Sequence, residues 1–134
     1  MHILIADDHA EVRRGLKEIL SDAVPGALFS EAANGEEVLG HLARCEYAML
    51  LLDINMPGCR GLNVLLNVKR IYPRLPVIIV SVQPEDQYAM CCLRSGAAAY
   101  VNKNNASEEL AEATRKILEG GRYVSSRATE KMLT

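Results

Sequence analysis

Short runs of apolar residues alternate along this chain with longer stretches in which apolar residues recur every three or four positions. The short runs predict buried strands, and the longer stretches predict helices that pack against them. The predicted strands cover residues 3–6, 27–33, 48–53, 77–80 and 98–101, and the predicted helices cover about 10–22, 36–43, 62–71, 85–95 and 107–119. Five strands that each lead into a helix predict an α/β fold with one parallel sheet and helices on both faces.

The most informative apolar run covers residues 49–52 and leads directly into Asp53. An uninterrupted run of this kind is typical of a strand that is buried on both faces of its sheet. Pro57 cannot take part in a strand ladder, so the strand is expected to end near Asp53. A carboxylate therefore follows a buried strand, at the edge of the sheet where open α/β folds form their sites.

Polar side chains follow three other predicted strands in the same way. Asp7 and Asp8 follow the first strand, Ser81 follows the fourth, and Lys103 follows the fifth. In the common strand order 2-1-3-4-5, strands one, three, four and five are neighbours. We therefore expect these side chains to converge with Asp53 at one edge of the sheet.

The expected cluster contains three carboxylates, which repel one another. A like-charged pair about 4 Å apart costs about 4 kcal/mol at an effective dielectric constant of about 20. Lys103 supplies one compensating charge, and a hard divalent cation with oxygen ligands, with Mg²⁺ the first choice, would supply the rest. A carboxylate, a lysine, a hydroxyl and Mg²⁺ around one point form a phosphoryl-transfer site. Asp53 is the expected nucleophile, and it would form an aspartyl phosphate.

Composition and charge narrow the class of function further. The chain has 134 residues, 49% of them hydrophobic, and a net charge of -2, which predicts one folded domain without a basic footprint for nucleic acid. No apolar run approaches the roughly 20 residues needed to span a bilayer, and the first strand begins too early to leave room for a signal peptide. Four cysteines without CxxC spacing favour free thiols, so we expect a cytoplasmic protein.

Taken together, these motifs resemble the receiver domain of a bacterial two-component response regulator. The resemblance covers roughly residues 3–120, and the motifs that carry it are Asp7-Asp8, Asp53 with Pro57, Gly58 and Gly61, Ser81, Tyr100 and Lys103. It implies the CheY-like, flavodoxin-like fold, a doubly wound sheet of five parallel strands in the order 2-1-3-4-5.

The resemblance also implies a set of metal ligands. Asp8 and Asp53 are expected to bind Mg²⁺ directly, together with the backbone carbonyl of Asn55. Asp7 is expected to contribute through a water molecule. His9 lies in the same loop, and we expect it to be solvated and not to be a ligand.

The partners and the remaining residue roles are implied in the same way. A phosphohistidine on a sensor histidine kinase would be the donor, and Asp53 would be the acceptor. Ser81 and Lys103 would contact the phosphoryl group, and Tyr100 would be the switch aromatic. Such a domain is not an enzyme in the usual sense, because it catalyses only its own Mg²⁺-dependent phosphorylation and dephosphorylation.

Residues 7–16, 95–103 and 120–123 are similar to the NarL/FixJ type of response regulator. Proteins of that type carry a C-terminal helix-turn-helix domain that binds DNA. We therefore expect residues 1–121 to form the receiver and residues 122–134 to begin a linker to a DNA-binding domain that this chain lacks. The full protein would be a transcription regulator, and phosphorylation would produce a homodimer or release the DNA-binding domain. A freestanding receiver is the alternative.

On sequence grounds, the same residues are also compatible with less specific roles and with different classes of protein. Asp7 and Asp8 alone could cap the first helix, Lys103 could be a surface lysine, and Tyr100 could be an ordinary core residue. A Mg²⁺-dependent phosphohydrolase would also use an aspartyl phosphate, but it typically carries Asp-x-Asp after its first strand. A flavodoxin-like FMN carrier would require a phosphate-binding loop after its first strand, where Asp7 and Asp8 would repel a phosphate. A pseudo-receiver, which acts only through protein interactions, would not bind Mg²⁺.

Overall fold

The computed structural model describes residues 1–54, 62–82 and 85–120. The strands are β1 (His2–Ala6), β2 (Leu28–Ala32), β3 (Met49–Leu52), β4 (Val77–Ser81) and β5 (Ala99–Asn102). The helices are α1 (Ala10–Ala23), α2 (Gly35–Arg44), α3 (Asn63–Ile71), α4 (Glu85–Arg94) and α5 (Ala106–Leu118), and a 3-10 turn, η1 (Lys103–Asn105), precedes α5. Each predicted strand and helix is present, and the bounds differ from the predicted ones by single residues.

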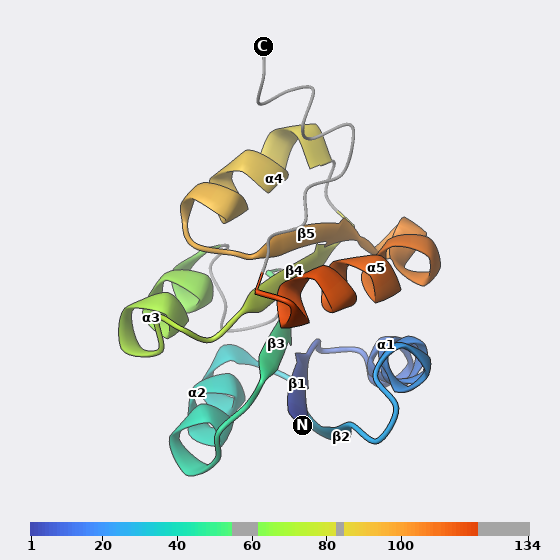
Figure 1. Ribbon diagram of the computed structural model, residues 1–134. Coiled ribbons are helices and arrows are strands. Elements are labelled where there is room, and N and C mark those ends of the chain that lie inside the picture. Colours follow the sequence, from blue (N-terminus) through green and yellow to red (C-terminus); the bar gives the residue numbers. More distant parts are fainter. Residues whose placement is uncertain (55–61, 83–84, 121–134) are drawn as a thin grey trace.

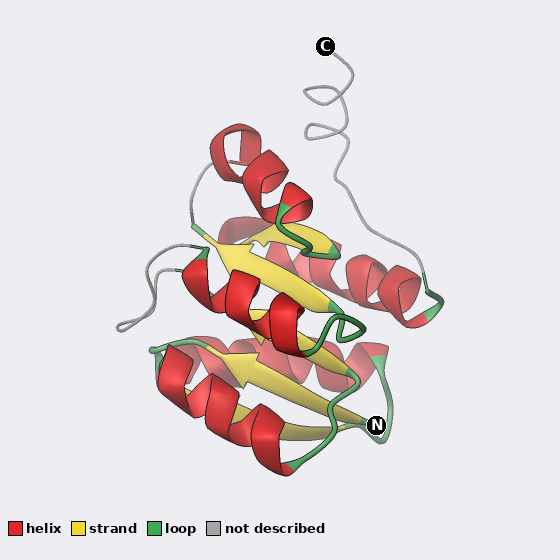
Figure 2. Ribbon diagram, turned by 90° about the vertical axis from the view of Figure 1, so that its left-hand side faces the viewer, coloured by secondary structure: helices red, strands yellow, loops and turns green. Residues whose placement is uncertain are grey.

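The five strands form one parallel sheet in the order β2-β1-β3-β4-β5, as predicted. Helices α1 and α5 lie side by side on one face of the sheet, and α2, α3 and α4 lie on the other (Figure 1). The view in Figure 2 shows the sheet as a layer between these two layers of helices. Among the residues that the structure describes, no helix combines the length and the apolar character that a bilayer span requires.

Neighbouring residues of each central strand pack into different apolar clusters, because side chains alternate between the faces of a sheet. In β1, Ile3 and Ile5 pack with residues of α1 and α5, whereas Leu4 packs with residues of α2 and α3. In β3, Leu51 joins the first cluster and Leu50 joins the second. Burial on both faces explains why these strands read as uninterrupted apolar runs in the sequence.

From the sequence, Gly96 is expected to end the fourth helix as a C-terminal cap, and the structure confirms this expectation. Gly96 has a φ of 108°, in the left-handed region that favours glycine. A Cβ atom at this position would come within 3.0 Å of the Lys69 side chain. The ammonium of Lys69 in turn donates to the carbonyls of Pro73 and Leu75, at 2.9 and 2.8 Å, which ties α3 to the turn that follows it.

From the sequence, Ser107 is expected to cap the last helix and Asp7 or Asp8 could cap the first, but the structure has other residues at both N-caps. Helix α5 begins with Asn105 at the N-cap, so Ser107 lies inside its first turn. The cause is η1, in which the backbone N–H of Asn104 donates to the Asn102 side chain at 2.9 Å and starts the turn early. Helix α1 has His9 at its N-cap without a side-chain capping bond, so neither aspartate caps it from that position.

Candidate functional site

Two of the three carboxylates come from equivalent positions on neighbouring strands. Ala6 of β1 pairs with Leu52 of β3, and the backbone N–H of Asp53 donates to the carbonyl of Ala6 at 2.9 Å. Asp7 and Asp53 are therefore the first residues beyond the paired ladder on each strand, and alternation directs both toward the α1 and α5 face. Asp7 is 1% exposed and Asp53 is 3% exposed.

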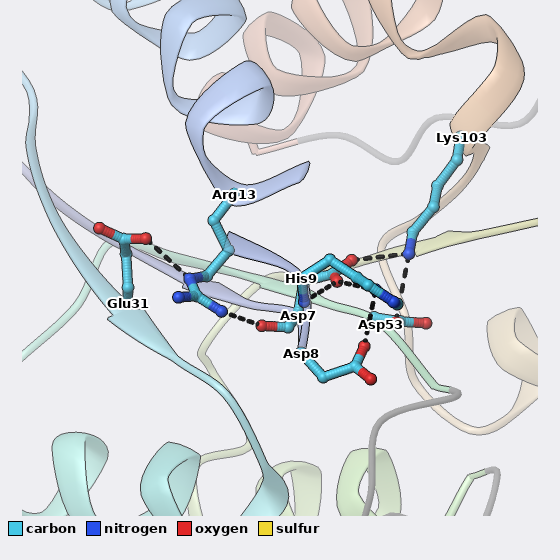
Figure 3. A network of polar contacts seen from close by, with 7 residues as sticks. All are labelled: Asp7, Asp8, His9, Arg13, Glu31, Asp53 and Lys103. Atoms are coloured by element: carbon cyan, nitrogen blue, oxygen red, sulfur yellow. Dashed lines mark hydrogen bonds and ion pairs between the residues drawn. The ribbon is translucent and has the colours of Figure 1, made fainter. Parts of the chain in front are cut away.

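Lys103 lies between these two buried acids. Its Nζ is 2.6 Å from Oδ2 of Asp7 and 3.2 Å from Oδ2 of Asp53 (Figure 3). Burial by itself lowers the pKa of Lys103, but the hydrogen bond to Asp7 and the negative charges of Asp53 and Asp7 outweigh it and raise the pKa above its ordinary value. The lysine is therefore a fixed positive charge at neutral pH, shared by two carboxylates from different strands.

Asp8 and His9 form the more open side of the site. The Nδ1 atom of His9 lies 3.3 Å from Oδ1 of Asp7 and 3.1 Å from Oδ1 of Asp8 (Figure 3). One potential ligand atom from each of Asp7, Asp8 and His9 lies within 4.8 Å of the others. The His9 side chain is 58% exposed, as expected for a solvated loop residue, although its ring contacts both acids.

The donors in this site suit a hard divalent cation. The carboxylate oxygens of Asp7, Asp8 and Asp53 are the kind of ligand that Mg²⁺ prefers. Oδ1 of Asp8 is buried beside Nδ1 of the exposed His9 at 3.1 Å, so a cation that displaces this imidazole gains an oxygen ligand. The residues present therefore fit Mg²⁺. Asn55, the expected source of a carbonyl ligand, lies outside the described residues.

Ser81 and Tyr100 share the opposite face of the sheet. In the β4–β5 ladder, Ile79 pairs with Tyr100 and Ser81 pairs with Asn102, so Ser81 and Tyr100 are diagonal neighbours on one face. Ser81 is completely buried, and Tyr100 is 3% exposed in the apolar cluster that also contains Cys92 of α4. The structure thus places the predicted hydroxyl at the end of its strand, and the predicted switch aromatic inside the core.

Arg13 also contacts the site, and Glu31 contacts Arg13; their sequence positions alone did not assign either of them to it. Nη1 of Arg13 donates to the backbone carbonyl of Asp7 at 2.6 Å, and Nε donates to Glu31 at 2.7 Å (Figure 3). Lys17 contacts the other oxygen of Glu31 at 3.1 Å, and the hydrogen bonds from Arg13 and Lys17 lower the pKa of Glu31. The sequence did contain one signal for these contacts: Arg13 and Lys17 are four positions apart and so lie on one face of their helix, where both can reach an acid such as Glu31 on a neighbouring strand.

A separate cavity of about 510 Å³ lies away from this site. Tyr47, Tyr72 and Leu75 contribute to its lining. These residues precede β3 and β4, whereas the acids follow β1 and β3. The cavity and the acidic site are therefore at opposite ends of the sheet.

The fold and the acidic edge define a doubly wound α/β domain with the components of a phosphoryl-transfer site. Residues 3–115 match the response regulator receiver domain, so this chain belongs to that family. Membership confirms the resemblance seen in the sequence. It also assigns the chain to a class of two-component signalling domains and not to metabolic enzymes.

Two relatives and one solved structure show the extent of the similarity. The response regulator GacA of Pseudomonas protegens is 31% identical over 133 residues, covering 99% of this chain and 62% of GacA. The response regulator UvrY of Escherichia coli K12 is 30% identical over 132 residues, covering 98% of this chain and 61% of UvrY. A structure of RcsB from Salmonella typhimurium superposes with a TM-score of 0.89 at 21% identity, over 99% of this chain and 67% of RcsB, and it supports the fold alone. The chain therefore spans about three fifths of the length of these two relatives.

Proposed function

We propose that this domain accepts a phosphoryl group on Asp53 from a phosphohistidine of a sensor histidine kinase. The observation that carries the proposal is the shared ammonium of Lys103, 2.6 Å from Asp7 and 3.2 Å from Asp53. A phosphoryl group brings close to two negative charges. A carboxylate that is already buried beside another acid accepts it only where fixed positive charge is next to it.

The transfer itself needs little covalent chemistry from the protein. One carboxylate oxygen of Asp53 forms a bond to phosphorus while the P–N bond of the phosphohistidine breaks, and the electron pair remains on the imidazole nitrogen. Asp8, Asp53 and the backbone carbonyl of Asn55 would hold Mg²⁺ directly, and Asp7 would hold it through water. When bound, Mg²⁺ supplies positive charge that neutralises the phosphoryl oxygens. In this proposal the domain promotes only its own phosphorylation and dephosphorylation.

Lys103, Ser81 and Tyr100 then link the phosphoryl group to a change of shape. Lys103 is within reach of the oxygens of a phosphoryl group bound to Asp53, and the Ser81 hydroxyl donates a hydrogen bond to one of these phosphoryl oxygens. Movement of Ser81 toward the phosphoryl group leaves space on its face of the sheet, which Tyr100 fills. The surface formed by α4, β5 and α5 differs between the two states, and a partner that binds one of them shifts the population.

The proposal extends to a longer, cytoplasmic protein. Residues 1–121 would be the receiver, and residues 122–134 would begin a linker to a C-terminal helix-turn-helix domain. Two observations support this extension: GacA and UvrY are longer response regulators, and RcsB, which has the same fold, has been solved in complex with DNA. Phosphorylation would then control dimerisation, or release of the DNA-binding domain.

Intact-mass measurement after incubation with acetyl phosphate and Mg²⁺ tests the central claim. The wild-type chain should gain one phosphoryl group, and Asp53→Asn should gain none because its amide is not a nucleophile. Asp22→Asn is the matched control, since Asp22 is an exposed residue of α1. A wild-type chain that gains no mass, or an Asp53→Asn variant that gains as much, would contradict the proposal.

A further inference from the structure

The backbone of β1 loses its strand partners within the acidic pair, at Asp7. The last bond between β1 and β2 at this end runs from the N–H of Asp7 to the carbonyl of Ala32, at 3.0 Å. The carbonyl of Asp7 then accepts a hydrogen bond from Nη1 of Arg13 at 2.6 Å. A charge-assisted bond from a side chain therefore holds the chain where the sheet no longer does.

This contact controls how Asp8 enters the site. The peptide that joins Asp7 to Asp8 is planar, so the direction of the Asp7 carbonyl also sets the N–H and Cα of Asp8. Oδ1 of Asp8 lies 3.1 Å from Nδ1 of the exposed His9, and the backbone N–H of His9 donates to Oδ1 of Asp7 at 2.9 Å. Arg13 and His9 therefore both act on this loop, and Arg13 is the side chain that holds the Asp7–Asp8 peptide itself.

Glu31 holds Arg13 in turn. Nε of Arg13 donates to Oε1 of Glu31 at 2.7 Å, so one planar guanidinium contacts the acid and the Asp7 carbonyl through different edges. Nζ of Lys17 contacts Oε2 of Glu31 at 3.1 Å. Of these two cations on α1, Arg13 is the one that also reaches the backbone of the site.

We propose that Arg13 is a positioning residue for the metal site and that Glu31 orients it. The inference rests on the proposed function, because it concerns the same acids. Charge alone makes the opposite prediction: removal of a cation beside three carboxylates should strengthen the binding of a dication. The direction of the change in Mg²⁺ affinity therefore separates positioning from simple electrostatics.

A pair of double variants with unchanged net charge removes the electrostatic ambiguity. Arg13→Met with Glu31→Gln removes the contact to the Asp7 carbonyl. Lys17→Met with Glu31→Gln also removes one cation and the same anion, but it keeps that contact. With Mg²⁺ alone as the probe in isothermal titration calorimetry, the first double variant should raise the Kd about tenfold or more. The second should change it by less than about threefold, and Arg13→Lys should retain part of the wild-type affinity.

The Mg²⁺ dependence of phosphorylation by acetyl phosphate provides a second readout. The first double variant should require more Mg²⁺ for half of its maximal rate, by the same factor as the Kd, while its rate at saturating Mg²⁺ stays close to that of wild type.

A merely structural role would lower the Tm and leave the Kd unchanged, and that result would overturn the inference. Equal Kd values for the two double variants, or a wild-type chain that does not bind Mg²⁺, would overturn it as well. A wild-type chain that binds Mg²⁺ but is not phosphorylated would contradict only the proposed function, and the Kd values would still decide the positioning role.

Discussion

The two faces of the sheet carry different kinds of polar group at the edge where the site lies. On the α1 and α5 face, Asp7 and Asp53 are charged and share the ammonium of Lys103. On the α2, α3 and α4 face, Ser81 and Tyr100 are neutral groups, and both are buried. Alternation of side chains along the strands is sufficient to separate the two sets.

The two faces differ in what it costs to move their polar groups. Charges with fixed partners at 2.6 and 3.2 Å lose much interaction energy when they move, so they keep the geometry of the site. In the proposed function, a hydroxyl and an aromatic ring on the neutral face shift instead, and their movement separates no ion pair. We therefore expect one face to perform the chemistry and the other to transmit its result.

The largest effect should follow from the loss of Lys103. Lys103→Met leaves Asp7 and Asp53 buried without their shared cation, and the free energy of unfolding should fall by about 3 kcal/mol or more in the absence of Mg²⁺. Added Mg²⁺ should restore part of the loss. Urea unfolding measures both quantities. Lys116→Met is the control, because the exposed pair with Glu112 at 3.9 Å should contribute about 0.5 kcal/mol or less. Similar losses in the two variants would show that the charged face is not held as described.

On the neutral face, the next largest effect should come from Ser81. Ser81→Ala removes the donor proposed for the phosphoryl group, and a hydrogen bond to a charged group is worth about 1.5–3 kcal/mol. The rate of phosphorylation by acetyl phosphate should therefore fall about tenfold to a hundredfold, as measured by intact mass over time. Ser95→Ala, in the turn after α4, should keep the wild-type rate. An unchanged rate in Ser81→Ala would remove this residue from the proposed mechanism.

Alkaline pH should weaken the neutral face before the charged one. Burial and, to a smaller extent, the charge of Cys91 raise the pKa of the Cys92 thiol from 9.0 to about 12. The unfolded chain then ionises first, so stability is full below pH 9 and falls as the pH rises toward 12, by about 1.4 kcal/mol at pH 10.

Lys103 behaves similarly at higher pH. Its folded pKa lies above the ordinary value of 10.5, so its contribution is complete below that pH and is lost as the pH rises through the raised pKa. Chemical unfolding between pH 8 and 10 should therefore show a decline in wild type and a smaller decline in Cys92→Ala. Parallel pH profiles for the two proteins would contradict the assigned burial of the thiol.

The smallest expected effect is a gain in stability from replacing Thr114, a residue on the buried side of α5. Thr114 is fully buried, and its hydroxyl has no hydrogen-bond partner among the described residues. Thr114→Val keeps the shape of the side chain and removes the unsatisfied group, so the free energy of unfolding should rise by about 1 kcal/mol. Thermal or urea unfolding measures the change. A loss of similar size would indicate that the hydroxyl is satisfied in solution.

Local pattern was enough to predict the order and type of every described strand and α-helix, but not the 3-10 turn η1. The apolar run that becomes β3 is continuous because both faces of that strand are covered, and its end at Asp53 follows from the first polar residue after it. The convergence of Asp7, Asp53 and Lys103 followed from topology, because parallel strands in this order bring their carboxyl ends to one edge. Hydrophobic periodicity and the position of polar residues are properties of short segments, so they can be read from the sequence without the tertiary structure.

The partners of each side chain depended on the assembled structure. The position of Lys103 between Asp7 and Asp53 and the contact of Arg13 with the Asp7 carbonyl depend on the strand register and on the rotation of α1 about its axis. A shift of one residue in register would turn each strand side chain to the other face, and no short segment of sequence specifies that register. The chain thus encodes its polar groups locally, but packing of helices against the sheet decides which of them hold fixed charges and which are buried as neutral groups on the other face.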